Sequence, residues 1–255
     1  IVDLNFINRA TKGVYELGSV FKTFTVAAGL EEGLINTDTE FLNLEKRLQC
    51  GKSSISEYDN KIPSDLTVEQ ILIRSGNIGS VRIGQKLEII KLKAFLEKIG
   101  ILSKINFDIE EVGEPIPFKW GKCKLATVSF GHGITTTPLQ LAKAYAIISN
   151  GGFAVEPSLI KNELKNYQKK KRIIKAGISE KINPILRKIV TTKEGTAGFV
   201  NIEGYEVGGK TGTAQKTIVG GYSKAKVNTF AGIFPASNPK YVLIVLLDEP
   251  KTSSD

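Results

Sequence analysis

The chain has 255 residues, of which 41% are hydrophobic, so it is long enough to bury a large core as one domain or as two subdomains. Its formal net charge is +9, but the basic residues are spread along the sequence and aromatic residues make up only 8%, without a base-stacking motif. Nucleic-acid binding is therefore not expected, and the one dense basic run, residues 169–172, is expected in a surface loop. No run of 18 apolar residues and no signal peptide occurs, so none of this sequence is expected to span a membrane.

The first helix is expected over residues 19–33, where apolar side chains supply a buried face and Gly33 ends the helix. Ser19 and Lys22 stand at i and i+3, so their side chains lie on one helical face within reach of each other. A serine hydroxyl is a poor nucleophile at neutral pH and needs a neighbouring base. The positive end of a helix favours a forming alkoxide and a lowered lysine pKa. Alone, this pattern also fits an ordinary buried helix capped by Ser19, but with the motifs that follow it predicts a nucleophile, Ser19, and its base, Lys22.

A second helix is expected over about residues 68–74, because residues 67–70 have the form of a capping box. This helix would deliver Ser75, Gly76 and Asn77 at its C-terminal end. Ser75 is predicted to relay a proton between the lysine and a leaving amine. The amide of Asn77 is predicted to hydrogen-bond a substrate amide and to orient the lysine, and Gly76 is expected to let the loop turn tightly.

Two more helices and three strands are expected towards the C-terminus. Helices are predicted over residues 138–149, opened by Thr137 and a proline, and 179–190, despite Pro184. Strands are predicted over residues 205–215, 227–236 and 240–248. The turn sequence between the last two predicts an antiparallel meander with the first strand at one edge.

The first of these strands carries glycines where a ligand must approach the backbone closely. Lys210 is counted with Ser19, Lys22, Ser75 and Asn77 as a catalytic residue and is predicted to attract a substrate carboxylate by charge. The hydroxyls of Thr211 and Thr213 are predicted to hydrogen-bond that carboxylate. Gly212 leaves room for that group. The strand is therefore predicted to bind the substrate.

The ordered set S-x-x-K at residues 19–22, S-G-N at 75–77 and K-T-G-T at 210–213 resembles the pattern of penicillin-binding proteins and serine β-lactamases. The surrounding sequence matches as well, over residues 13–18, 77–79, 129–133, 194–197 and 208–215. The chain is most similar to the transpeptidase domain of a class B penicillin-binding protein of the septal, cell-division type. An asparagine at position 77 followed by Ile78 favours the septal over the elongation enzymes.

The resemblance implies an α/β (α+β) fold of the penicillin-binding and serine β-lactamase type, an antiparallel sheet flanked by helices. It implies a helical subdomain over about residues 34–150, an α/β part made of residues 1–33 and 151–255, and a cleft between them. It also implies an oxyanion hole made by the backbone N–H groups of Ser19 and Thr213. Only 18 residues precede Ser19, where the family has two strands, and only residues 1–6 resemble one, so the chain is expected to be N-terminally incomplete.

The activity implied is a D,D-transpeptidase that cross-links peptidoglycan, in which Ser19 attacks the penultimate D-alanyl carbonyl of a stem peptide. β-Lactam antibiotics would acylate the same serine. Division-complex membrane proteins are the implied partners, and the implied location is the bacterial inner membrane, with this domain in the periplasm and its anchor outside this sequence. The alternatives are a serine β-lactamase and a non-catalytic β-lactam sensor or division scaffold. Against a β-lactamase, no E-x-x-L-N string follows Asn77, as class A requires, and class D prefers valine at that position.

The chain offers no cluster of metal ligands, so neither a metal nor another cofactor is expected. Cys50 and Cys123 are too far apart in sequence for a metal knuckle, and His132 is the single histidine. His132 is expected to be a structural loop residue, because nothing in the sequence designates the partners of a Ser-His-Asp triad. The compartment implied by the resemblance permits a disulfide, but the sequence leaves open whether the two cysteines meet.

Overall fold

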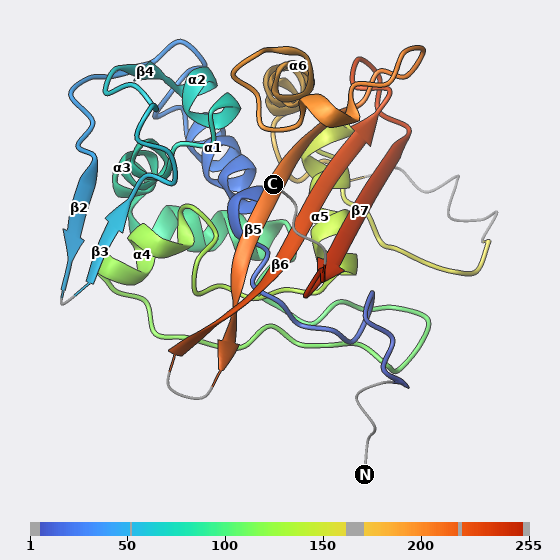
Figure 1. The fold of residues 1–255 in the computed structure, drawn as a ribbon. Coiled ribbons are helices and arrows are strands. Elements are labelled where there is room, and N and C mark those ends of the chain that lie inside the picture. Colours follow the sequence, from blue (N-terminus) through green and yellow to red (C-terminus); the bar gives the residue numbers. More distant parts are fainter. Residues whose placement is uncertain (1–5, 52, 162–170, 219–220, 252–255) are drawn as a thin grey trace.

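A three-stranded antiparallel sheet stands at the centre of the molecule. The structure is a computed structural model that describes residues 6–51, 53–161, 171–218 and 221–251. In the sheet, β5 (Gly208–Ile218) pairs with β6 (Gly221–Phe234), which pairs with β7 (Tyr241–Asp248). Helices α5 (Pro138–Ser149) and α6 (Ala176–Thr191) pack against one face of this sheet (Figure 1). The predicted meander, with the 205–215 strand at one edge, is thereby confirmed.

Most of the remaining elements lie beyond the β5 edge of the sheet (Figure 1). The helical ones are η2 (Gly18–Phe21, a 3-10 turn), α1 (Lys22–Glu31), α2 (Val68–Ile73), α3 (Asn77–Lys98), α4 (Lys122–Val128) and η4 (Gly198–Val200, also 3-10). Two small antiparallel pairs join β1 (Glu40–Phe41) to β4 (Leu66–Thr67), and β2 (Arg47–Cys50) to β3 (Ser53–Ser56).

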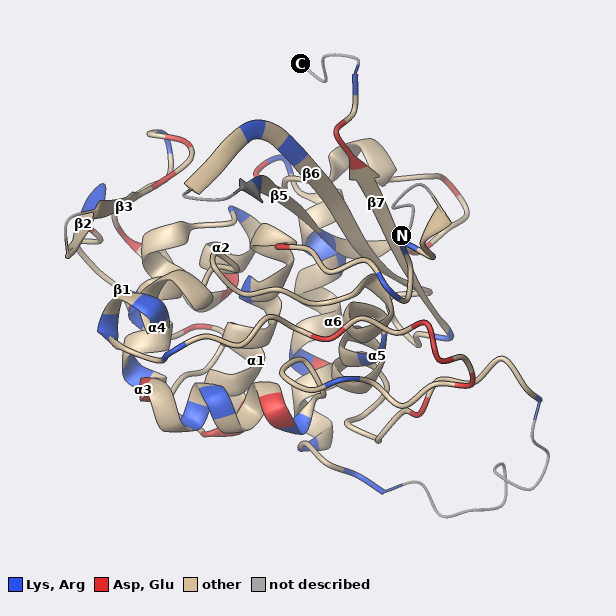
Figure 2. Ribbon diagram, turned by 90° about the horizontal axis from the view of Figure 1, so that it is seen from below, with Lys and Arg blue, Asp and Glu red and all other residues tan. Residues whose placement is uncertain are grey.

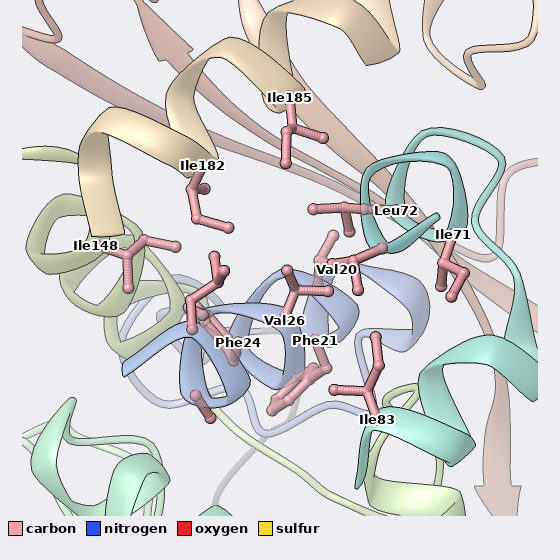
Figure 3. Packing of buried hydrophobic residues seen from close by; sticks show 14 of the residues in the cluster. Val20, Phe21, Phe24, Val26, Ile71, Leu72, Ile83, Ile148, Ile182 and Ile185 are labelled. Carbon is pink, nitrogen blue, oxygen red and sulfur yellow. The ribbon is translucent and has the colours of Figure 1, made fainter. Parts of the chain in front are cut away.

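Helix α1 runs through the middle of the hydrophobic core. All 10 of its residues are buried, and such a helix must be surrounded on every side. Figure 3 shows apolar side chains of η2 and α1 meeting residues from four other helices. The residues labelled there are Val20, Phe21, Phe24 and Val26 from η2 and α1, Ile71 and Leu72 from α2, Ile83 from α3, Ile148 from α5, and Ile182 and Ile185 from α6. This packing fixes η2, which carries Ser19, against the rest of the molecule.

The expected helices are confirmed, with shifted ends. Thr67 and Thr137 each form a capping box, with Gln70 and Gln140 as the respective partners, and α6 continues through Pro184. The first helix differs more, because its α-helical part begins only at Lys22 and Ser19 lies in the preceding 3-10 turn. The predicted position of Ser19 in the first α-helical turn is therefore wrong by one short turn.

A disulfide joins the β2–β3 hairpin to helix α4. Cys50, at the end of β2, pairs with Cys123, 73 residues further along the chain. This bond answers the question that the sequence left open. Closing a loop of this length typically stabilises a folded domain by about 2–4 kcal/mol. The hairpin is thereby tied at one end to the helix that leads into residues 129–133.

Charged residues of both signs are scattered over the described surface, with Lys and Arg on α3, α4 and β6 among other elements (Figure 2). Residues 1–5, part of the one strand-like run expected before Ser19, lie outside the described residues, as do 162–170, which include the start of the basic run. Phe6, the last residue of the strand-like run, does not lie in a strand. No helix in the described ranges is long and apolar enough to cross a membrane.

Candidate active site

The three sequence motifs meet at one cleft of about 540 Å³. Ser19 reaches it from η2, Ser75 from the connection between α2 and α3, Asn77 from the start of α3, and residues 211–213 from β5. Lys22 and Lys210 lie beneath the cleft and are fully buried, whereas Ser19 is half-buried. Thr211, Gly212 and Thr213 line the cleft, where the sequence predicts the substrate to bind. All eight predicted site residues are therefore at or directly under this surface.

Lys22 is held by the S-G-N motif. Its Nζ donates to the carbonyl oxygen of Ser75 and, at 2.7 Å, to Oδ1 of Asn77, and it lies 3.1 Å from Oγ of Ser75. Burial lowers the pKa of Lys22 to about 7, although the negative charge of Glu57 opposes this shift. A large share of this side chain is therefore neutral near pH 7, and a neutral amine can accept a proton. In the described residues no hydrogen bond joins it to the hydroxyl of Ser19.

Lys210 contacts the same serine from the other side. Its Nζ lies 2.8 Å from Oγ of Ser75, and its pKa is well below the ordinary lysine value because of burial first and the charge of Lys22 second. Ser75 thus stands between two amines. The sequence suggests that Lys210 contacts a substrate carboxylate directly. Its buried position on Ser75 instead favours a role in moving a proton through Ser75.

The tight turn in the S-G-N motif is made by its serine. Ser75 has a φ of 56°, in the left-handed region, whereas Gly76 has an ordinary φ of −63°. The prediction that Gly76 supplies the turn is therefore wrong. A non-glycine residue in this conformation typically costs about 1–3 kcal/mol. In this conformation, both the carbonyl oxygen and the hydroxyl of Ser75 lie within hydrogen-bond distance of Nζ of Lys22.

Strand β5 runs directly against the nucleophile turn, and two glycines permit this contact. A Cβ on Gly18, whose φ is +64°, would lie 2.5 Å from the carbonyl oxygen of Thr213. A Cβ on Gly212 would lie 2.2 Å from the carbonyl oxygen of Leu17. The backbones around Ser19 and Thr213 are therefore close neighbours, as the predicted oxyanion hole requires. That the N–H groups of Ser19 and Thr213 form this hole stays a prediction.

The walls of the cleft include residues that the motifs do not designate. Thr196, in a stretch that resembles the family, places Oγ1 2.8 Å from Oγ1 of Thr211. Tyr58, which follows β3, lines the opposite side without any sequence signal. His132 also lines the cleft, with its ring 4.7 Å from that of Tyr222, and burial lowers its pKa. It is therefore a wall residue, stacked between aromatic rings.

Comparison with known proteins decides the family. The model of the penicillin-binding protein transpeptidase domain matches residues 2–255. This chain belongs to that family. The transpeptidase domain is 30% identical to the probable peptidoglycan D,D-transpeptidase FtsI of Caulobacter vibrioides, over 98% of the chain and 44% of the relative. The chain thus spans less than half of that relative.

Solved structures of penicillin-binding proteins have the same fold as this transpeptidase domain. The apo transpeptidase domain of penicillin-binding protein 3 from Burkholderia pseudomallei superposes with a TM-score of 0.87, at 26% identity over 95% of this chain and 74% of that one. Penicillin-binding protein 3 from Mycobacterium tuberculosis, complexed with aztreonam, gives a TM-score of 0.85 at 26% identity, over 96% of this chain and 59% of that one. The predicted family and fold class are confirmed.

Proposed function

We propose that this chain is the catalytic domain of a serine D,D-transpeptidase that cross-links peptidoglycan stem peptides through an acyl-enzyme. The observation that carries the proposal is the placement of Ser75 between the two buried lysines, Lys22 and Lys210, beside a cleft that exposes Ser19. A serine nucleophile needs a neutral base close by, and a lysine with a pKa near 7 can serve as one.

In the first step, Oγ of Ser19 attacks the penultimate D-alanyl carbonyl carbon, and Lys22 takes the hydroxyl proton. The oxyanion is stabilised by the N–H groups of Ser19 and Thr213. The C–N bond then breaks, and the proton passes from Lys22 through Ser75 to the nitrogen of the departing D-alanine. Lys210 supports this transfer through its contact with Ser75.

In the second step, the amine of a neighbouring stem peptide attacks the ester carbon and gives up a proton to Lys22 through Ser75. The ester C–O bond then breaks, and Lys22 returns that proton to Oγ of Ser19. Asn77 hydrogen-bonds the substrate amide, and Thr211 and Thr213 bind the terminal carboxylate of the donor beside Gly212. This cleft lies between the proposed helical subdomain, about residues 34–150, and the α/β part formed by residues 1–33 and 151–255.

We also propose a septal role, β-lactam binding and an extracytoplasmic site of action. The similarity to FtsI of Caulobacter vibrioides supports the septal role, and the aztreonam complex of the Mycobacterium tuberculosis protein supports the binding of a β-lactam by this cleft. Division-complex membrane proteins are the proposed partners, with the bacterial inner membrane as the place of anchorage.

Intact-mass spectrometry after addition of a penicillin tests the proposed function. A transpeptidase is expected to accumulate a penicilloyl adduct of one drug molecule per chain that persists for minutes to hours, because it lacks a second base, besides the one used in acylation, that activates water against the ester. In the described residues no carboxylate lines the cleft, which supports a long-lived adduct. A protein that returns quickly to its unmodified mass while hydrolysing the drug is a β-lactamase. A protein that never gains the mass lacks the proposed activity.

Changing Thr211 to Val is expected to slow acylation by roughly 10- to 150-fold, because it removes a hydrogen bond to a charged carboxylate. Stopped-flow acylation with a penicillin and with an analogue that lacks the carboxylate gives the comparison, and the defect is expected to be smaller for the analogue. Thr191→Val, on the exposed side of α6, is the control. An equal loss with both compounds would mean that Thr211 does not bind the carboxylate.

A further inference from the structure

Glu57 holds the start of helix α3 from outside the sequence motifs. It directly follows β3, and its two carboxylate oxygens accept hydrogen bonds from the backbone N–H groups of Asn77, at 2.6 Å, and Ile78, at 2.9 Å. These are the first two residues of α3, whose N–H groups have no partner within the helix. A carboxylate at this position is also favoured by the helix dipole. Glu57 therefore anchors Asn77, the third residue of the S-G-N motif, which lines the cleft.

Both neighbours of Glu57 bind the same connection. The carbonyl oxygen of Ser56 accepts a hydrogen bond of 2.8 Å from Nδ2 of Asn77, and the hydroxyl of Tyr58 donates one of 2.9 Å to the carbonyl oxygen of Arg74. The bond to Ser56 orients the Asn77 amide so that Oδ1 points to Nζ of Lys22, 2.7 Å away. Three consecutive residues thus hydrogen-bond Asn77, the last residue of the S-G-N motif, and Arg74, the residue just before it.

We propose that Glu57 is a positioning residue for acylation, which holds Asn77 so that its side chain keeps Lys22 in place beside Ser75. The proposal rests on the proposed function, because its readout is the acylation of Ser19. The carboxylate acts in a second way, through its charge. Burial disfavours protonated Lys22, and Glu57 is the negative group that opposes this effect. Removing that charge lowers the pKa of Lys22 further.

Two substitutions separate position from charge. Glu57→Gln keeps the shape of the side chain but loses the charge, and its NH₂ group cannot accept a hydrogen bond, so one of the two backbone N–H groups is left unpaired. Glu57→Asp keeps the charge but is one methylene shorter, so its carboxylate is drawn back from the two N–H groups and these hydrogen bonds are lengthened or lost. Asp59→Asn is the matched control, because it removes a charge two residues away, and the side-chain bond of Asp59 is to Lys61 in its own turn.

The experiment measures the second-order rate constant of penicillin acylation between pH 5 and 9 for each variant, with folding checked by circular dichroism. Glu57→Gln is expected to acylate roughly 10- to 100-fold more slowly at high pH. The acid limb of its pH–rate profile, where the rate falls as Lys22 becomes protonated, is expected to move to lower pH. Glu57→Asp is expected to lose rate without moving the limb, and Asp59→Asn to behave as wild type.

Wild-type rates and an unmoved acid limb in both Glu57 variants overturn the inference while the proposed function stands. An equal loss at every pH, with the same acid limb in Glu57→Gln as in wild type, also overturns it, because a structural role alone would give that result. If Glu57→Gln fails to fold, the high-pH rate of Glu57→Asp decides. A wild-type chain that forms no adduct overturns the proposed function, and this inference with it.

Discussion

Changing Ser19 to Ala is expected to abolish covalent labelling by a fluorescent penicillin. The substitution removes the only oxygen that can form the acyl bond in the proposed mechanism, so the loss is complete. The fold is expected to persist, because the Ser19 hydroxyl is half-buried and makes no hydrogen bond within the described residues. Gel fluorescence gives the labelling, and circular dichroism gives the fold.

Ser54→Ala is the matched control for this experiment, because Ser54 is an exposed serine on β3, away from the cleft. It is expected to label like the wild-type chain. Labelling of the Ser19 variant at the wild-type rate would remove Ser19 from the mechanism and would direct the search for a nucleophile to Ser75, the other serine in the cleft.

Changing Lys22 to Met is expected to slow acylation by about 10² or more, the usual contribution of a positioned base. Methionine fills a similar volume, so the buried site is kept packed while the amine is lost. Stopped-flow acylation measures the effect, with Lys12→Met, at an exposed position, as the control. A rate near that of the wild type would show that another group takes the Ser19 proton.

The pH dependence of the wild-type chain belongs to the same prediction. The neutral form of Lys22 is the active base, so acylation is expected to rise as the pH increases through about 7 and to fall below it. In Lys22→Met this acid limb is expected to disappear from the residual rate. A limb that remains unchanged in the variant would belong to another group.

Local signals in the sequence predict local structure well here. The capping box at Thr67 and the Thr137–Pro138 pair mark helix starts, and in the structure each threonine accepts a hydrogen bond from the backbone N–H three positions along the chain. The motif residues are also found from sequence, since their chemistry restricts the residue types. The same reasoning misplaces the tight turn, because it assigns the turn to Gly76, whereas the left-handed conformation is found at Ser75.

Contacts between distant segments are what the sequence does not reveal. Glu57 reaches Asn77 across 20 residues, and nothing in the residues around Glu57 marks it as more than a surface carboxylate. The sequence predicts that the charge of Lys210 attracts a substrate carboxylate, and only the packing of β5 against η2 and α6 shows that Lys210 is buried on Ser75. The pairing of Cys50 with Cys123 likewise depends on how a hairpin meets a helix.

The two buried lysines also set a pH-dependent penalty on folding. An unfolded chain protonates Lys22 at its ordinary pKa of 10.5, whereas the folded chain does so only below about 7. Between these values the unfolded state binds more protons, so stability rises with pH across this interval, and the penalty is complete below it. The shift of Lys210 has the same sign. The unfavourable contribution of these two lysines is thus largest under the acidic conditions in which Lys22 is also inactive as a base, and part of the folding free energy is given up to keep an amine uncharged.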